Sequence, residues 1–283
     1  SLRTPLRRAA AIAIGFLFLI GCFYSIVWGF ANTVVRGGDK DLTEFAVLVA
    51  PTDPQARLSH AHQLEKTFDL DAIGRSLKEY ETVVALSPNN YLYWLYLGQA
   101  RERDGDRAGA ETAYRQSLRL APNYGRPFWA LGNNLARQGK VDEGFEYIRR
   151  AVEQDQTFAS PAVAAAMLAF DGDSRRVSTA LGGSTVAIGE VVKYLAAQKR
   201  IDEALTVWEG SSQQQRNGDL REAGNALLKS LLDEKRFKAA AGLARDLAAE
   251  PSKAPRTGVF VNGGFESGVT LQSQDAFDWQ LSS

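Results

Sequence analysis

The stretch "ALSPNNYLYWLYLGQARERDGDRAGAETAYRQSLRLAPNYGRPFWALG", residues 85–132, contains two prolines in equivalent surroundings. Pro88 and Pro122 each close an alanine- or leucine-rich run, and an aromatic-led run follows each of them. Pro54 lies 34 residues before Pro88, and Pro122 lies 34 residues after it. Each interval holds a first apolar helix, a short polar turn and a second helix. This period indicates a stack of helix-turn-helix repeats.

Individual positions within the copies follow one pattern. In the copy that begins at Tyr91, the pattern positions are filled by Trp94, Leu97, Gly98, Ala110, Tyr114 and Pro122; in the next copy, from Gly125, by Phe128, Leu131, Gly132, Gly144, Ile148 and Ala151. The pattern resembles that of the tetratricopeptide repeat family. Small residues opposite large ones let paired helices interdigitate, which agrees with the resemblance. The resemblance implies an α-solenoid whose first helices line a groove.

We therefore expect an all-α fold, a tetratricopeptide-type α-solenoid that is preceded by one transmembrane helix and followed by a short β segment. The solenoid is predicted over residues 57–250. Its parts are clearer repeats at 57–88, 91–122 and 125–156, an irregular helical pair at 157–184, and divergent repeats at 185–250. At least three repeats are needed for such a stack to support itself, and the chain exceeds that number.

The amino-terminal part is predicted to span a membrane. Residues 9–35 contain no charged side chain, and a bilayer core of about 30 Å needs only about 20 apolar residues in a helix. Residues 1–8 hold three arginines and no acid, which favours a cytoplasmic amino terminus. Residues 36–56 are then a juxtamembrane connector. Lipid is an expected partner through residues 9–35.

Two processed forms are alternatives to the uncleaved anchor. A secretory signal has a shorter apolar stretch, of roughly 7–15 residues. "LIGC" at 19–22 resembles a lipobox with Cys22 as the acylated residue, but the sequence after Cys22 stays apolar. We favour the anchor. We expect the solenoid on the periplasmic or other extracytoplasmic side of a bacterial inner membrane, because the chain calls for neither disulfides nor eukaryotic glycosylation.

The carboxyl-terminal residues follow a different pattern. A proline-bearing linker is predicted at 251–258, and 259–283 reads as short strands and turns. "NGGFE" at 262–266, followed by Trp279, is similar to the opening of jelly-roll domains of the carbohydrate-binding-module type. That resemblance implies a structural calcium near Glu266 and a carbohydrate partner; a β tail packed on the last helix is the alternative. Because a new pattern begins so late, we expect the printed chain to be part of a longer one.

Composition gives little support to nucleic-acid binding or catalysis. Thirty-three basic and 33 acidic residues cancel, so phosphate-driven nucleic-acid binding has no basic surplus to rest on. The single cysteine, Cys22, can form neither an internal disulfide nor a cysteine cluster for zinc. His60 and His62 point about 200° apart on a helix, which favours structural roles. We expect no enzyme activity and no cofactor.

We expect the chain to work by binding protein partners, as a membrane-anchored scaffold that helps to assemble a membrane-associated complex. By the repeat register, the groove residues are Leu92, Leu95, Gln99, Glu102, Arg126, Trp129, Asn133 and Arg137. Trp129 stands beside Phe128, and adjacent helix positions cannot both face one core. Tryptophan and arginine dominate binding energy at interfaces. The alternative is a cell-envelope polysaccharide-binding or polysaccharide-assembly protein that uses the carboxyl-terminal β segment.

Overall fold

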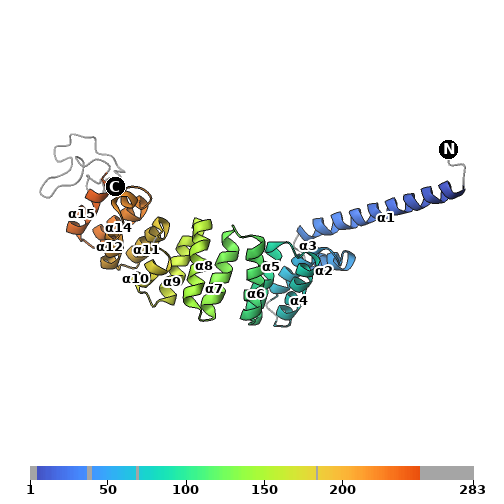
Figure 1. Ribbon diagram of the computed structural model, residues 1–283, viewed down its shortest axis with the longest axis horizontal. Coiled ribbons are helices and arrows are strands. Elements are labelled where there is room, and N and C mark those ends of the chain that lie inside the picture. Colours follow the sequence, from blue (N-terminus) through green and yellow to red (C-terminus); the bar gives the residue numbers. More distant parts are fainter. Residues whose placement is uncertain (1–4, 37–39, 68–69, 183, 249–283) are drawn as a thin grey trace. The chain divides into compact units, whose positions relative to one another are not determined.

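The computed structural model describes residues 5–36, 40–67, 70–182 and 184–248. Throughout these residues the regular structure is helical, and none of them forms a strand (Figure 1). The expected all-α fold is therefore confirmed for the described part of the chain. The predicted linker at 251–258 and β segment at 259–283, with Glu266, lie outside it.

The chain divides into two compact units, residues 1–134 and residues 135–283. Helices of the first unit follow one another in the order α1 (Pro5–Arg36), α2 (Lys40–Val49), α3 (Pro54–Glu65), α4 (Leu70–Leu86), α5 (Tyr91–Asp104) and α6 (Arg107–Leu120), and most of α7 (Gly125–Arg137) also belongs to it. Consecutive helices from α3 to α6 pack against one another. The hairpins α3–α4 and α5–α6 occupy the first two predicted repeats.

The second unit contains the remaining helices. They are α8 (Val141–Gln154), the 3-10 turn η1 (Gln156–Phe158), α9 (Ala159–Ala169), α10 (Ser174–Ala180), α11 (Thr185–Ala197), α12 (Ile201–Glu209), α13 (Gln213–Asn217), α14 (Arg221–Asp233) and α15 (Phe237–Leu247). Helix α11 packs against α9, α12 and α14, and α14 packs against α15. The elements of the second unit are thus helices that pack on one another.

Local signals in the quoted stretch explain the α5–α6 hairpin. The Asn90 side chain caps α5 by accepting a hydrogen bond from the backbone N–H of Leu92, at 3.0 Å. Helix α5 ends at Asp104 and is followed by Gly105, whose φ of 91° is the left-handed conformation that glycine adopts without strain. The next residue, Asp106, caps α6 through the N–H of Gly109, at 2.8 Å. The "DGD" motif at 104–106 therefore builds a turn.

Close contact between α5 and α6 depends on Gly98. A Cβ atom built on Gly98 would overlap the ring of Tyr114, which is itself fully buried. The Trp94 indole N–H donates to the carbonyl of Pro88, at 2.7 Å, and so joins the start of this repeat to the end of the one before. These pattern positions hold the repeat together, as the resemblance implies.

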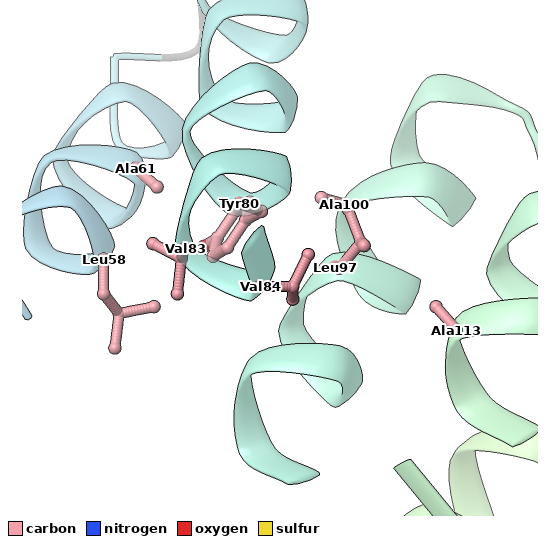
Figure 2. Close-up of a cluster of buried hydrophobic side chains, with 8 residues drawn as sticks. All are labelled: Leu58, Ala61, Tyr80, Val83, Val84, Leu97, Ala100 and Ala113. Carbon is pink, nitrogen blue, oxygen red and sulfur yellow. The ribbon is translucent and has the colours of Figure 1, made fainter. Parts of the chain in front are cut away.

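One buried cluster runs through the first two hairpins. Figure 2 shows Tyr80 and Val83 of α4 between Leu58 of α3 and Leu97 of α5. The cluster comprises Leu58, Ala61, Tyr80, Val83, Val84, Leu97, Ala100 and Ala113. Alanines stand where helices approach and larger side chains fill the remaining space, which is the packing expected of stacked hairpins.

The second unit repeats this small-against-large contact with different residues. A Cβ atom on Gly224 of α14 would lie 2.6 Å from the Trp208 ring of α12. Two of its turns use lysine where the earlier turns use glycine: Lys199 has a φ of 58° and Lys235 a φ of 56°. A residue other than glycine is strained in the left-handed conformation, so these two turns carry more backbone strain than the turns that use glycine.

The residues predicted as a connector, 36–56, contain helix α2 and the start of α3, and α1 packs against both helices. Ala46 of α2 and Ala50, the residue after α2, form a small core with Ala56 of α3. A helix of ten residues lies outside the 34-residue period, which is why the repeat pattern did not predict it.

Candidate partner-binding surface

The predicted groove residues lie on α5 and α7. Leu92 and Gln99 of α5 are partly buried, and so are Trp129 and Asn133 of α7. Arg126 at the start of α7 is exposed. These five side chains retain some accessible surface within the first unit, whereas Arg137 is exposed beyond the boundary between the units.

Leu95 does not belong to an accessible surface. Its side chain is 1 % exposed, which corrects the predicted assignment of this residue to the groove. The reason is that α5 packs against both α4 and α6. The buried part of its surface is therefore wider than that of a helix with a single neighbour. Leu95, Leu97, Gly98 and Ala100 are all buried.

Glu102 is occupied by contacts inside the unit. The Tyr114 hydroxyl donates to Glu102 Oε2, at 2.8 Å, and the side-chain amide of Asn134 donates to Glu102 Oε1, at 2.9 Å. The carboxylate therefore joins α5 to both α6 and α7. Hydrogen bonds to a charged group contribute about 1.5–3 kcal/mol, which gives Glu102 a structural role.

Asn134 was missed by the sequence analysis, although it is fully buried. Asn133, next to it, bonds to its own helix, because its amide donates to the Trp129 carbonyl at 2.8 Å. The signal that separates them is spacing. Asn134 is three residues after Leu131 and shares its buried side of α7, so a buried polar contact could have been expected there.

Titratable groups between α3 and α4 form a structural cluster. Arg57 Nη1 lies 2.9 Å from Glu79 Oε2, and His60 Nδ1 lies 3.3 Å from Glu79 Oε1. Burial acts to raise the pKa of Glu79, but the nearby His60 ring and the hydrogen bond from Arg57 outweigh it and hold the pKa below its usual value. The charges are matched across the helix pair.

His62 fits between two aromatic rings. Its ring centroid lies 5.9 Å from that of Tyr80 on α4 and 5.2 Å from that of Tyr96 on α5. Burial lowers the pKa of His62, and the nearby Glu65 carboxylate opposes that shift. His62 is thus part of the packing between α3, α4 and α5. Within the described ranges no three His, Cys, Asp or Glu side chains are grouped so that they could hold a metal ion.

These observations define the class: the described residues form an all-α protein of stacked helical hairpins with tetratricopeptide-like spacing. No family model and no curated protein matches the chain.

Several solved structures are similar to the chain. MamA is 13 % identical, with 76 % of this chain and 94 % of MamA covered and a TM-score of 0.46. YrrB, described as a TPR protein with an unusual peptide-binding site, is 16 % identical, with 72 % and 90 % covered and a TM-score of 0.37. PilF of Pseudomonas aeruginosa is 13 % identical, with 80 % and 90 % covered and a TM-score of 0.40. Because these identities and scores are low, the class rests on the chain's own helices.

Proposed function

We propose that the chain is a membrane-anchored scaffold whose helical hairpins bind protein partners outside the cytoplasm. The observation that carries the proposal is the combination of α1 with the hairpins. Residues Arg8–Val27 form a helix long and apolar enough to cross a membrane, and the side chains of that window are not buried within the chain. Phe16, Leu17 and Phe18 are each at least 65 % exposed. An isolated helix with such a surface requires lipid or another apolar cover.

The charges around α1 support the orientation. Arg3, Arg7 and Arg8 precede the apolar window, whereas the residues after α1 mix both signs. This bias supports a cytoplasmic amino terminus, with the hairpins on the opposite side of the membrane. The anchor then raises the effective concentration of the hairpins near other membrane components.

Anchoring can be tested against the alternative of a cleaved signal sequence, because an apolar helix near the amino terminus fits either role. Full-length chain is expressed in a bacterial host, and its membranes are washed at alkaline pH. We expect the chain to stay with the membrane and its intact mass to include α1. A soluble chain that lacks residues 1–36 would contradict the proposal.

Partner binding is proposed to use the accessible side chains of α5 and α7, with Arg126 and Trp129 as anchors and Leu92, Gln99 and Asn133 around them. Arginine and tryptophan contribute most at interfaces, and their loss typically costs at least 2 kcal/mol at a hot spot. Arg137 is a further candidate that belongs to the second unit. The positive charge of Arg126 favours a partner segment that carries a carboxylate.

A matched pair of arginines tests this surface. Arg126→Glu on α7 reverses the charge at the proposed surface, and Arg119→Glu does so on α6, where Arg119 is also exposed. Partners are cross-linked in intact membranes and identified by mass spectrometry. We expect Arg126→Glu to lose partners that Arg119→Glu retains. An identical partner set for both variants and for Trp129→Ala would contradict the assignment.

A further inference from the structure

Helix α2 exposes large apolar side chains on the part of its surface that does not pack on the hairpins. Thr43, Ala46 and Ala50 are buried, and the latter two contact Ala56 of α3. Leu42, Phe45 and Leu48 are instead 44 %, 46 % and 77 % exposed. Single exposed apolar residues are common on protein surfaces, but three on one helix of ten residues form a group that calls for a cover.

The position of α2 indicates what covers these side chains. Only residues 37–39 separate α1 from α2, and α1 packs against both α2 and α3. In Figure 1 the helices α2 and α3 lie beside one end of α1. The exposed apolar group is therefore held next to the helix that is proposed to cross the bilayer.

Helix geometry places α2 near the depth of the lipid headgroups. The apolar window of α1 ends at Val27, and the helix continues to Arg36. Those nine further residues extend about 13 Å beyond the window, whereas the polar region on each side of a bilayer is roughly 5–8 Å thick. A helix packed alongside these last turns, rather than beyond them, can therefore reach the bilayer surface. Leucine and phenylalanine are residue types that interfacial helices bury there.

We propose that Leu42, Phe45 and Leu48 of α2 insert into the bilayer surface beside α1, so that lipid covers the exposed apolar side of α2. The inference rests on the proposed membrane anchoring. The chain is then held at the membrane at two adjoining places, through α1 and through α2.

The test uses full-length chain in phosphatidylcholine vesicles, with Cys22→Ala as background because Cys22 is the only cysteine. An environment-sensitive fluorophore is attached at Leu48→Cys. The matched control is Leu86→Cys at the end of α4, where the native leucine is 38 % exposed. We expect lipid-borne nitroxide near the headgroups to quench the Leu48 label several-fold more than the Leu86 label. Aqueous iodide should show the opposite order. Circular dichroism verifies that both labelled chains fold alike.

Three outcomes would overturn the inference, and they have different meanings. If the chain stays with the vesicles at alkaline pH but iodide quenches both labels equally, α2 does not touch lipid while the anchor stands. If the Leu48 label is protected from iodide and from lipid nitroxide alike, protein covers it, such as a second copy of the chain. If the chain leaves the vesicles at alkaline pH, the proposed function itself fails.

Discussion

Gly98 and Tyr114 set the separation of the two helices in the α5–α6 hairpin. The space that a side chain at Gly98 would need is already filled by the Tyr114 ring. Gly74 of α4 is the opposite case, because nothing lies within 4 Å of a Cβ built there. Glycine is therefore required for close packing at position 98, whereas at position 74 of the same unit a side chain has room.

We predict that Gly98→Ala destabilises the first unit and that Gly74→Ala does not. Overpacking a filled contact costs about 1–3 kcal/mol, whereas alanine in an open helical position gains up to about 1 kcal/mol over glycine. Urea unfolding followed by circular dichroism measures both free energies. Equal effects of the two substitutions would show that the Gly98 contact does not restrain the hairpin.

Lys235 gives a prediction of the opposite sign. Its φ of 56° lies in the left-handed region, where a side chain costs roughly 1–2 kcal/mol. Glycine relieves that strain but loses more chain entropy on folding. We expect Lys235→Gly to raise the free energy of unfolding by up to about 1 kcal/mol. The control Lys238→Gly, within α15, should lower it. A loss of stability at both positions would contradict the role of strain.

Single residues also show where sequence analysis succeeds and where it stops. Gly98, Tyr114 and Trp94 were predicted because each occupies a pattern position whose packing requirement is local. The burial of Leu95 depends instead on α5 having neighbours on two sides, which its own sequence does not reveal. Asn134 depends on the distant Glu102, 32 residues earlier.

At the scale of helices, His62 joins α3 to α4 and α5 and makes their packing sensitive to pH. Because burial lowers the pKa of His62 below its ordinary 6.5, the unfolded chain takes up a proton at a higher pH than the folded chain. Stability is then complete above about pH 6.5 and falls as pH decreases through the folded pKa.

We predict that the thermal midpoint of the first unit falls as pH is lowered from 7.5 towards 5. His62→Gln should reduce this fall, because no imidazole then takes up a proton upon unfolding. A fall of the same size in the parent chain and in His62→Gln would assign the pH dependence to other groups.

The helices that sequence analysis missed are those outside the repeat. Helices α2 and α13 have ten and five residues, and neither continues the 34-residue spacing. The hairpins were predictable because many sequence positions together support the 34-residue period. The accessible part of α5 and α7 was less predictable, since exposure depends on the neighbours of each helix.

For the whole molecule, the repeat arrangement predicts that a destabilising substitution affects mainly the helices next to it. Helices of a repeat array contact mainly their neighbours, so stability is close to a sum of local terms. We expect Gly98→Ala in the full chain to accelerate amide hydrogen exchange in α4, α5 and α6. Exchange in α14 and α15 should remain within about 0.5 kcal/mol of the parent chain. Uniform acceleration through α15 would instead indicate that the chain unfolds as one cooperative body.

The short connection after α1 limits how far the hairpins can travel. Arg36 and Lys40 are joined by four Cα–Cα steps, which span roughly 15 Å at most, and α1 already packs against α2 and α3. A binding domain on a long tether samples a large volume of solvent. The short connection between α1 and α2 instead keeps the first hairpin close to the end of α1. If α1 lies in the bilayer, a partner in the same membrane reaches the hairpins by lateral diffusion. For such a partner, occupancy would follow its two-dimensional density in the membrane more closely than a bulk concentration.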